Sequence, residues 1–286
     1  MTALLDVKDL KVSFRQDGQL IPAVRGVSFA VNRGETVALV GESGSGKSVS
    51  ALSTVSLLGE SAQVSGSVTY NGQQMIGADD KLLRDVRGND ISFIFQEPMT
   101  SLNPLHTVGR QMAEVLRLHS DLDAEARHAA CVEMLESVGI SRAAERLKAY
   151  PHQFSGGMRQ RVVIAIALLA RPRLIIADEP TTALDVTIPS QILKLMRRQI
   201  AEKGASMILV THDLAVVSEM ADHITVPYCG NVVERGRTRA LIEAPAHPNT
   251  RGAPGGLRDP SHRPRPRTPI PAHHHLTHTT PPARGT

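Results

Sequence analysis

The sequence predicts an α/β fold with a parallel sheet, and two observations support this prediction. From residue 91 onward, short apolar runs typical of buried strands alternate with stretches typical of helices, which is the order of elements in folds with a parallel sheet. Nearer the N-terminus, a strand-like run at 36–40 leads through a glycine-rich loop into a helix-like stretch at 48–58. Because parallel sheets bind ligands at the carboxyl ends of their strands, this loop indicates where a site should lie.

Residues 4–31 predict a second, antiparallel sheet beside the glycine-rich loop. Their short apolar segments are separated by turn signals at Gly18 and at 32–34. A further β-like run at 66–70 ends at Asn71-Gly72, a pair typical of tight hairpin turns.

The remaining elements are predicted from apolar runs and capping residues. Three core strands are expected, at 91–95, 174–178 and 206–211. Helices are expected within 108–139, where Gly139 is placed as a C-terminal cap, and from Ser155 to about residue 170. The later helix is apolar all round from residue 162, so we expect it to be buried.

Composition limits the classes of partner. The 286 residues, 41% of them hydrophobic, suffice for one large domain or two small ones. Aromatic residues make up 3% and there is no Trp, which argues against a stacking platform for single-stranded nucleic acid. Residues 253–286 hold five Arg and one Asp, a net charge of +4, which equals the whole-chain difference between 32 basic and 28 acidic residues. Residues 1–252 are therefore neutral overall, and no nucleic-acid partner is expected.

Cysteine usage and apolar runs indicate a soluble, cytosolic protein whose membrane role would need a partner. Cys131 lies in an apolar helical row and far from Cys229, so a buried free thiol and a reducing compartment are expected. No signal-like segment opens the chain, and the longest apolar run, at 162–170, is nine residues and too short to span a bilayer. Residues 253–286 hold eight prolines and five histidines and are predicted to be disordered.

The glycine-rich loop matches the phosphate-binding pattern G-x-x-x-x-G-K-[ST]. The candidate phosphate-binding residues are Gly41, Glu42, Ser43, Gly44, Ser45, Gly46, Lys47 and Ser48. Glycines let successive backbone N–H groups converge on an anion at a helix N-terminus. Lys47 would reach the β- and γ-phosphates, and the Ser48 hydroxyl would ligate Mg²⁺. The alternative, a Gly/Ser-rich turn that matches by chance, is disfavoured by the strand and helix on either side.

Two acidic residues follow an apolar strand. Phosphate-loop ATPases carry the second part of their metal site at such a strand end. Asp178 is a candidate ligand of Mg²⁺, and Glu179 can polarise an attacking water. Acids at the end of a strand are commonly only solvated, but the pairing with the phosphate loop favours the catalytic interpretation.

Ser155, Gly156 and Gly157 form a candidate second anion site. A hydroxyl and two glycines that open a helix leave backbone N–H groups exposed at the favourable end of the helix dipole. One nucleotide needs a single phosphate loop, so a second site makes sense if it closes on the nucleotide held by another subunit. For these three residues alone, an ordinary helix N-cap is an adequate interpretation.

Taken in order, the motifs between about residues 5 and 252 resemble those of ATP-binding-cassette (ABC) proteins, and 155–160 is similar to the signature of that family. The resemblance implies a P-loop NTPase core with a parallel sheet, a flanking antiparallel β-subdomain and an inserted α-helical subdomain at about 97–160, all within 1–252. It also implies ATP and Mg²⁺ as ligands, and two protomers that enclose two ATP molecules head to tail.

The resemblance also assigns roles residue by residue. Phe14 stands where the family places an aromatic ring against adenine, and Gln96 where a glutamine senses Mg²⁺ and the attacking water. His212 matches the histidine that contacts the γ-phosphate. Asp185 matches the loop that crosses the dimer interface, and Glu179 the general base.

Within the family, the detail is similar to the ATPases of oligopeptide, dipeptide and nickel permeases, in the stretches 96–104, 150–161, 178–187 and 247–250. This similarity implies an importer subunit at the cytoplasmic face of the cell membrane. The implied partners are a second ABC ATPase subunit, integral membrane permease subunits and, indirectly, an extracytoplasmic solute-binding protein. Met99 to Pro104 is then expected near the membrane subunit. Two alternatives stay open, a soluble ABC ATPase of DNA repair or translation and a weakly active cassette with a damaged C-terminus.

Three features depart from the family pattern. Phe14 replaces the commoner tyrosine. Pro227 falls within an expected strand, where the loss of a donor N–H is tolerable only at a sheet edge. After Gly252, an Arg/Pro/His/Thr-rich stretch without Cys replaces the apolar continuation and the iron–sulfur extension of the peptide group. We hypothesise a reading-frame change there, which an intact frame in independent clones would refute.

Overall fold

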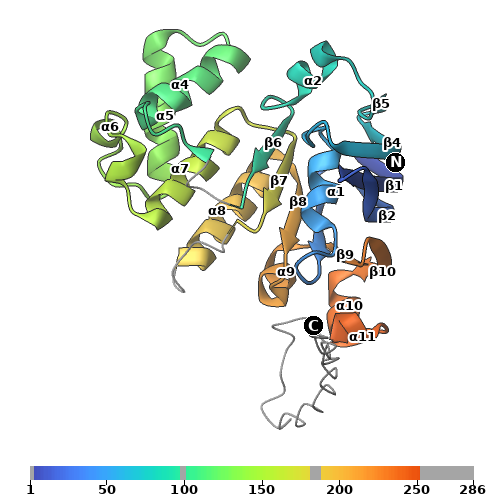
Figure 1. Ribbon diagram of the computed structural model, residues 1–286. Coiled ribbons are helices and arrows are strands. Elements are labelled where there is room, and N and C mark those ends of the chain that lie inside the picture. Colours follow the sequence, from blue (N-terminus) through green and yellow to red (C-terminus); the bar gives the residue numbers. More distant parts are fainter. Residues whose placement is uncertain (1–2, 97–100, 181–187, 252–286) are drawn as a thin grey trace, which may run out of the picture. The chain divides into compact units, whose positions relative to one another are not determined.

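The computed structural model describes residues 3–96, 101–180 and 188–251 (Figure 1). In this part of the chain, a parallel sheet has the strand order β10-β9-β3-β8-β7-β6, in which only β9 and β10 are antiparallel neighbours. Its strands are β3 (Thr36–Val40), β6 (Ile91–Ile94), β7 (Leu174–Asp178), β8 (Ser206–Thr211), β9 (His223–Tyr228) and β10 (Asn231–Arg237). The predicted parallel sheet and its core strands are therefore confirmed.

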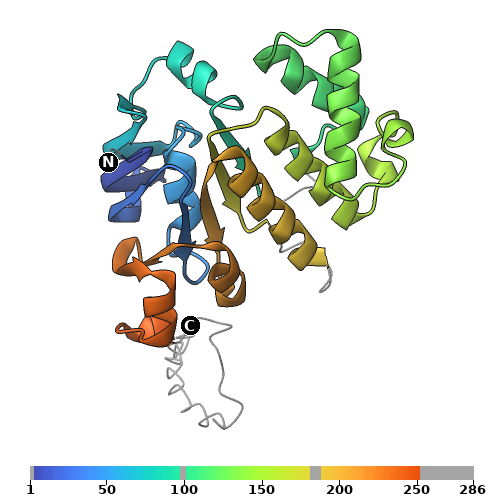
Figure 2. The same ribbon diagram turned by 180° about the vertical axis from the view of Figure 1, so that it is seen from behind.

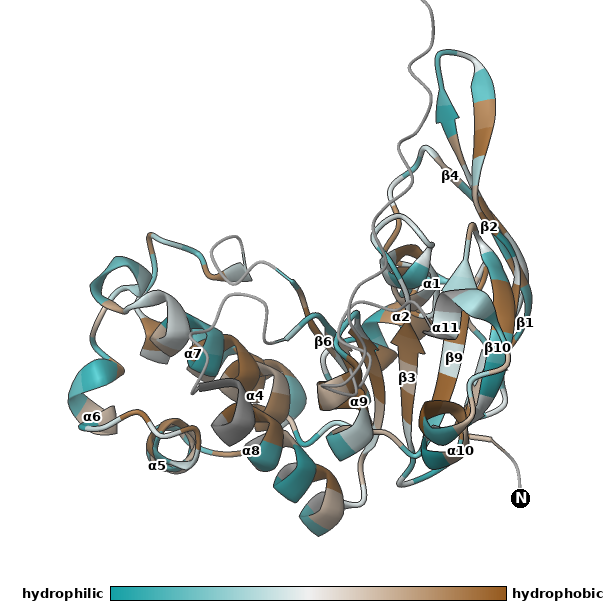
Figure 3. Ribbon diagram, turned by 90° about the horizontal axis from the view of Figure 1, so that it is seen from below, coloured by the Kyte–Doolittle hydropathy of each residue, from teal (hydrophilic) through white to brown (hydrophobic). Residues whose placement is uncertain are grey.

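The parallel sheet is buried on both faces, and alternate residues of its central strands point to opposite sides. One face packs against helices that follow β6 and contributes Ala38, Val40, Ile175, Ala177, Met207 and Leu209 to a first hydrophobic cluster. The other face packs against the antiparallel sheet and contributes Val37, Leu39, Leu174, Ile176, Ile208 and Val210 to a second cluster. Figure 3 shows the apolar colouring that runs along β3 between the two clusters.

The second sheet is antiparallel and has the order β2-β1-β4-β5. Its strands are β1 (Leu5–Gln16), β2 (Gln19–Val31), β4 (Ala62–Tyr70) and β5 (Gln73–Gln74). The prediction of several short segments in 4–31 was wrong in detail, because β1 and β2 are long strands whose register shifts interrupt the apolar alternation. The predicted turns are present. Gly18, Asn71 and Gly72 have φ of 77°, 49° and 83°, as tight hairpins require.

Helices cover both faces of the parallel sheet (Figures 1 and 2). The helices of the described residues are α1 (Lys47–Ser53), α2 (Asp80–Val86), α4 (Val108–His119), α5 (Ala124–Ser137), α6 (Ala143–Arg146), α7 (Gly156–Leu169), α8 (Ile188–Lys203), α9 (Leu214–Met220), α10 (Thr238–Glu243) and α11 (Pro248–Arg251), with a 3₁₀ turn at Pro151–Gln153. Residues of α4, α5, α7, α8 and α9 belong to the first cluster, whereas Ala51 of α1 belongs to the second.

The predicted helix ends agree with the structure in two places and differ in one. Gly139 has φ 75° and donates its N–H to the Glu136 carbonyl, 2.9 Å away, just past α5. Ser155 caps α7 and accepts a hydrogen bond from the Met158 N–H. The helix expected at 48–58 instead ends at Ser53, because Ser56 takes a left-handed φ of 53° and turns the chain.

Pro227 corrects the expectation that it lies at a sheet edge. Its strand, β9, lies between β3 and β10. The ladder between β3 and β9 ends at the pair Leu39 and Thr225, so Pro227 lies beyond it and is opposite Val232 of β10. The missing N–H therefore removes no bond to the central strand.

Two further expectations concern Cys131 and membrane spans. Cys131 is buried and makes no disulfide, as predicted, and burial raises the pKa of its thiol to about 11. In the described part of the chain, no helix combines the length and the apolar character that crossing a bilayer requires.

Candidate active site

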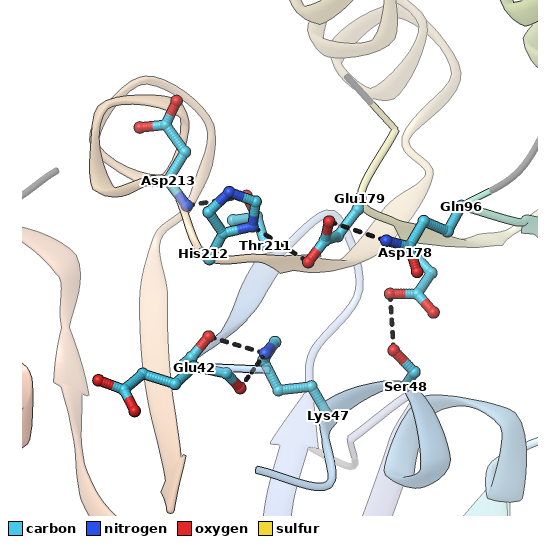
Figure 4. Close-up of polar contacts among 10 residues, drawn as sticks. Glu42, Lys47, Ser48, Gln96, Asp178, Glu179, Thr211, His212 and Asp213 are labelled. Carbon is cyan, nitrogen blue, oxygen red and sulfur yellow. Dashed lines mark hydrogen bonds and ion pairs between the residues drawn. The ribbon is translucent and has the colours of Figure 1, made fainter. Parts of the chain in front are cut away.

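Four parallel strands bring their carboxyl ends to one edge of the sheet, and the candidate catalytic residues lie there (Figure 4). The strands β3, β8, β7 and β6 are consecutive neighbours. The phosphate loop follows β3, His212 follows β8, Glu179 follows β7 and Gln96 lies two residues after β6. Chain segments more than 100 residues apart in sequence therefore meet because of strand order alone.

The phosphate loop is shaped by glycines that no other residue could replace without strain. Gly46 caps α1 with φ 94°, and a Cβ there would lie 2.8 Å from the Ala23 carbonyl oxygen of β2. A Cβ on Gly41 would lie 2.7 Å from the Pro227 carbonyl oxygen. Contacts this short do not occur for real Cβ atoms, so the loop is packed by backbone against backbone.

Lys47 points back into its own loop. Its Nζ donates hydrogen bonds to the carbonyl oxygens of Gly41, at 2.7 Å, and Glu42, at 2.8 Å (Figure 4). Burial lowers the pKa of the ammonium, and the negative charges of Glu179, Asp178 and Glu42 oppose that effect. A desolvated ammonium that donates to carbonyl oxygens gains when phosphate oxygens, which are charged acceptors, take their place.

Ser48 and Asp178 form a hydroxyl–carboxylate pair across the site. The Ser48 Oγ donates to Asp178 Oδ1 at 3.0 Å. Burial raises the pKa of the Asp178 carboxyl, and the hydrogen bond from Ser48 and the charge of Lys47 partly offset this. These two oxygens suit Mg²⁺, which takes one or two protein oxygens and completes its shell with phosphates and water. In the described residues, no group of three or more His, Cys, Asp or Glu side chains is arranged to hold a metal ion.

Glu179 is held by two side chains from different strands. Its Oε2 accepts a hydrogen bond from Gln96 Nε2, and its Oε1 lies against His212 Nδ1, each at 3.1 Å (Figure 4). Its backbone has φ 46°, in the left-handed region that non-glycine residues rarely adopt, and its N–H donates to the Val210 carbonyl at 2.8 Å. Such a conformation persists only where the surroundings hold it, and it is typical of functional sites.

The predicted second anion site is at the start of α7. There the Ser155 Oγ accepts from the Met158 N–H at 3.3 Å. A Cβ on Gly156 would meet nothing within 4 Å, so the helix start is open on that side. In the described part of the chain, no hydrogen bond or ion pair joins Ser155, Gly156 or Gly157 to the phosphate loop.

Phe14 lies on β1, opposite Ile21 of β2. Ile21 comes two residues before Ala23 of β2. The Ala23 carbonyl oxygen packs against Gly46 of the phosphate loop, because a Cβ on Gly46 would lie 2.8 Å from it. Phe14 is therefore on the part of the antiparallel sheet that packs on the phosphate loop. Asp185 lies outside the described residues, and so does the start of the segment from Met99 to Pro104.

Sequence reasoning missed two parts of the site. The turn between β9 and β10 packs on the phosphate loop, because Gly230 donates its N–H to the Ser45 carbonyl at 3.3 Å and accepts from the Arg25 N–H at 2.7 Å. Gln160 of α7 is buried and donates to the Pro180 carbonyl at 2.8 Å. A glycine after a strand signals the turn, but nothing local to Gln160 signals its partner 20 residues away.

The arrangement is suited to phosphoryl transfer to water. The loop and Lys47 supply backbone and ammonium donors for phosphate oxygens, Ser48 and Asp178 supply hard oxygens for a cation, and Glu179 supplies a carboxylate at the same edge.

Comparisons with known proteins agree with this chemistry. A family model described as "ABC transporter" matches residues 24–182. The oligopeptide transport ATP-binding protein AppD of Bacillus subtilis is 50% identical over 254 residues, which are 88% of this chain and 77% of AppD. The dipeptide transport ATP-binding protein DppD of Bacillus subtilis is 49% identical over 259 residues, 90% of this chain and 77% of DppD.

Solved structures show the same architecture. The ATP-binding cassette MJ0796, in a dimeric post-hydrolysis state bound to ADP and Pi, is 28% identical and superposes with a TM-score of 0.74, covering 82% of this chain and 99% of that one. CbiO1 from Clostridium perfringens, part of the ABC transporter complex cbiONQ, has a TM-score of 0.71 at 26% identity, covering 85% of this chain and 92% of that one. With these similarities in fold, sequence and site chemistry, the chain belongs to the ABC transporter family, as one of its ATP-binding, ATP-hydrolysing subunits.

Proposed function

We propose that this chain powers an importer of oligopeptides or dipeptides, or of a related solute such as nickel. The support comes from its relatives, whose names describe oligopeptide and dipeptide transport ATP-binding proteins at 46–50% identity. Its partners would be integral membrane permease subunits and, through them, an extracytoplasmic solute-binding protein. The chain would then work at the cytoplasmic face of the cell membrane.

In the proposed reaction, the phosphate loop and Lys47 bind the β- and γ-phosphates of ATP. Ser48 and Asp178, with Gln96, would hold Mg²⁺, which neutralises charge on the phosphates. Glu179 accepts a proton from a water molecule as the water oxygen bonds to the γ-phosphorus and the bond to the bridging oxygen of ADP breaks. His212, which lies against Glu179, would contact the γ-phosphate.

A second subunit completes the site in this proposal. Ser155, Gly156 and Gly157 of one protomer would bind the γ-phosphate held by the other, and Asp185 would lie at the interface. The open space at Gly156 supports this arrangement, since the start of α7 is available to a partner. Closing two protomers on ATP and reopening them after hydrolysis would drive transport. Phe14 would stack on the adenine.

The observation that carries the proposed hydrolysis is the placement of Glu179 between Gln96 and His212, at the edge that also holds Lys47 and Asp178. Glu179→Gln keeps the shape of the side chain and removes its basicity. We expect ATP turnover to fall by about 100-fold or more, while binding of labelled ATP persists and closed dimers accumulate in size-exclusion chromatography.

The matched control is Glu145→Gln on α6, where the carboxylate is exposed and pairs with the exposed Arg142. It should keep normal turnover. Undiminished hydrolysis by Glu179→Gln would remove Glu179 from the role of base.

A further inference from the structure

Gln160 stands out as a buried polar side chain that the mechanism above does not use. Only 1% of its surface is exposed. Its Nε2 donates to the Pro180 carbonyl at 2.8 Å, whereas no group in the described part of the chain donates to its Oε1. A buried amide with an unpaired oxygen is less favourable than an apolar side chain of equal size. Stability alone therefore does not account for a glutamine here.

Each of the two residues in this contact, Gln160 and Pro180, is close in the chain to a candidate site residue. Pro180 directly follows Glu179, whose left-handed backbone is already tied by its N–H to Val210 of β8. Gln160 lies four residues after Gly156, so both residues are on one face of α7, one turn apart. The contact thus links the helix whose start is open at Gly156 to the residue that directly follows the proposed general base.

We propose that Gln160 is a positioning residue that couples the start of α7 to the backbone of Glu179. The hydrogen bond from the Glu179 N–H to Val210 of β8 and the one from Gln160 to the Pro180 carbonyl fix the backbone on the N-terminal side of Glu179 and on the C-terminal side of Pro180. Docking of a ligand at the start of α7 then shifts the Pro180 carbonyl through Gln160 and orients the Glu179 carboxylate between Gln96 and His212. This inference rests on the proposed role of Glu179 as base and adds how its position is controlled.

Gln160→Met in the full-length chain tests the coupling, because methionine keeps the length of the side chain and removes the donor. We expect kcat for ATP hydrolysis to fall roughly tenfold or more, since small misplacement of a catalytic group has effects of this size. The KM for ATP should stay within about twofold, because the phosphate loop is untouched. The loss of the bond to Pro180 and the removal of the unpaired Oε1 act in opposite directions, so we expect little change in Tm.

Ile164→Val is the matched control, one turn further along the same face of α7 and fully buried. It removes one methylene from the core without touching Pro180, and should lower Tm while leaving kcat unchanged well below Tm. Gln160→Leu replaces the methionine variant if that variant does not fold.

A wild-type kcat in Gln160→Met would overturn the inference. The inference would also fail if Gln160→Met and Ile164→Val lowered Tm equally and Gln160→Met lowered kcat no more than Ile164→Val. Glu179→Gln in the same assay separates the two proposals. Full turnover in Glu179→Gln would refute the assignment of the base. Loss of turnover in Glu179→Gln together with normal kcat in Gln160→Met would refute only the coupling.

Discussion

The N-termini of α1 and α7 are both predicted anion sites, and they are built differently. At α1, Gly46 is in a left-handed conformation, no side chain caps the helix, and Lys47 lies within the loop. At α7, Ser155 is extended and its hydroxyl occupies the Met158 N–H. Gly46 is packed against Ala23, whereas Gly156 has open space.

In the proposed mechanism, this difference distinguishes a phosphate site formed by one chain from one that a second subunit completes. The start of α1 is enclosed by β2 and by the turn between β9 and β10, so its shape is set before any ligand arrives. The start of α7 is stabilised by an ordinary cap, and a Cβ on Gly156 would meet nothing within 4 Å. Under that proposal, the same physics of helix ends serves a preformed phosphate loop at α1 and a subunit interface at α7.

The largest expected effect is that of Gly46→Ala. The substitution forces alanine into φ 94° and places its Cβ 2.8 Å from the Ala23 carbonyl oxygen. We expect ATP affinity to fall by about 100-fold or more, and the free energy of unfolding by about 1–3 kcal/mol. Isothermal titration with ATP and thermal unfolding measure the two quantities. Normal affinity would show that the α1 end is not preformed as described.

Lys47→Met should weaken ATP binding by roughly 10- to 100-fold, because a charge-assisted contact to phosphate is lost. Without nucleotide, the same variant should be at least as stable as the wild type. The folded-state pKa of Lys47 lies below its ordinary value of 10.5, so the unfolded chain binds this proton more tightly and burial of the charged form destabilises the fold at neutral pH. A clear drop in the Tm of the nucleotide-free variant would contradict this account.

Gly156→Ala is the counterpart of Gly46→Ala at the second helix. Its Cβ meets nothing within 4 Å, and alanine is the better helix former, so stability should be unchanged or rise by up to about 1 kcal/mol. ATP binding by the single chain should also be unchanged. If a partner subunit closes on this surface, the new Cβ lies in its way, and hydrolysis should fall roughly tenfold or more. If Gly156→Ala and the wild type hydrolyse ATP at equal rates, Ser155 is only a helix cap and the start of α7 binds no partner's nucleotide.

Asp178→Asn should have the smallest effect on the nucleotide-free protein, and that effect depends on pH. Because burial raises the folded-state pKa of Asp178, the unfolded chain releases this proton more readily, and ionisation destabilises the fold as pH rises through the window above 3.8. We therefore expect the variant to have the higher Tm at neutral pH, with the difference shrinking as the pH falls toward that window. A variant that is less stable at neutral pH would show that the charge of Lys47 outweighs burial.

Much of the fold and of the candidate site could be predicted because the signals are local. The loop at 41–48, the acids after β7 and the capped start of α7 each occupy a few consecutive residues whose backbone requirements select particular amino acids. The parallel sheet follows from apolar runs of strand length between helices. The prediction was wrong where packing overrides local pattern, as in the long β1 and β2 strands and at Pro227 within β9.

By itself, the amino-acid sequence determined the α/β class, the phosphate loop and the chemical types at each strand end, because each depends on the conformation of a short stretch. Only the tertiary structure decided which of these groups meet. The order of β3, β8, β7 and β6 places Gln96 and His212 on either side of Glu179, and packing of α7 brings Gln160 to Pro180. Such contacts join residues that are distant in the chain, and only burial of both sheet faces brings them within hydrogen-bonding distance.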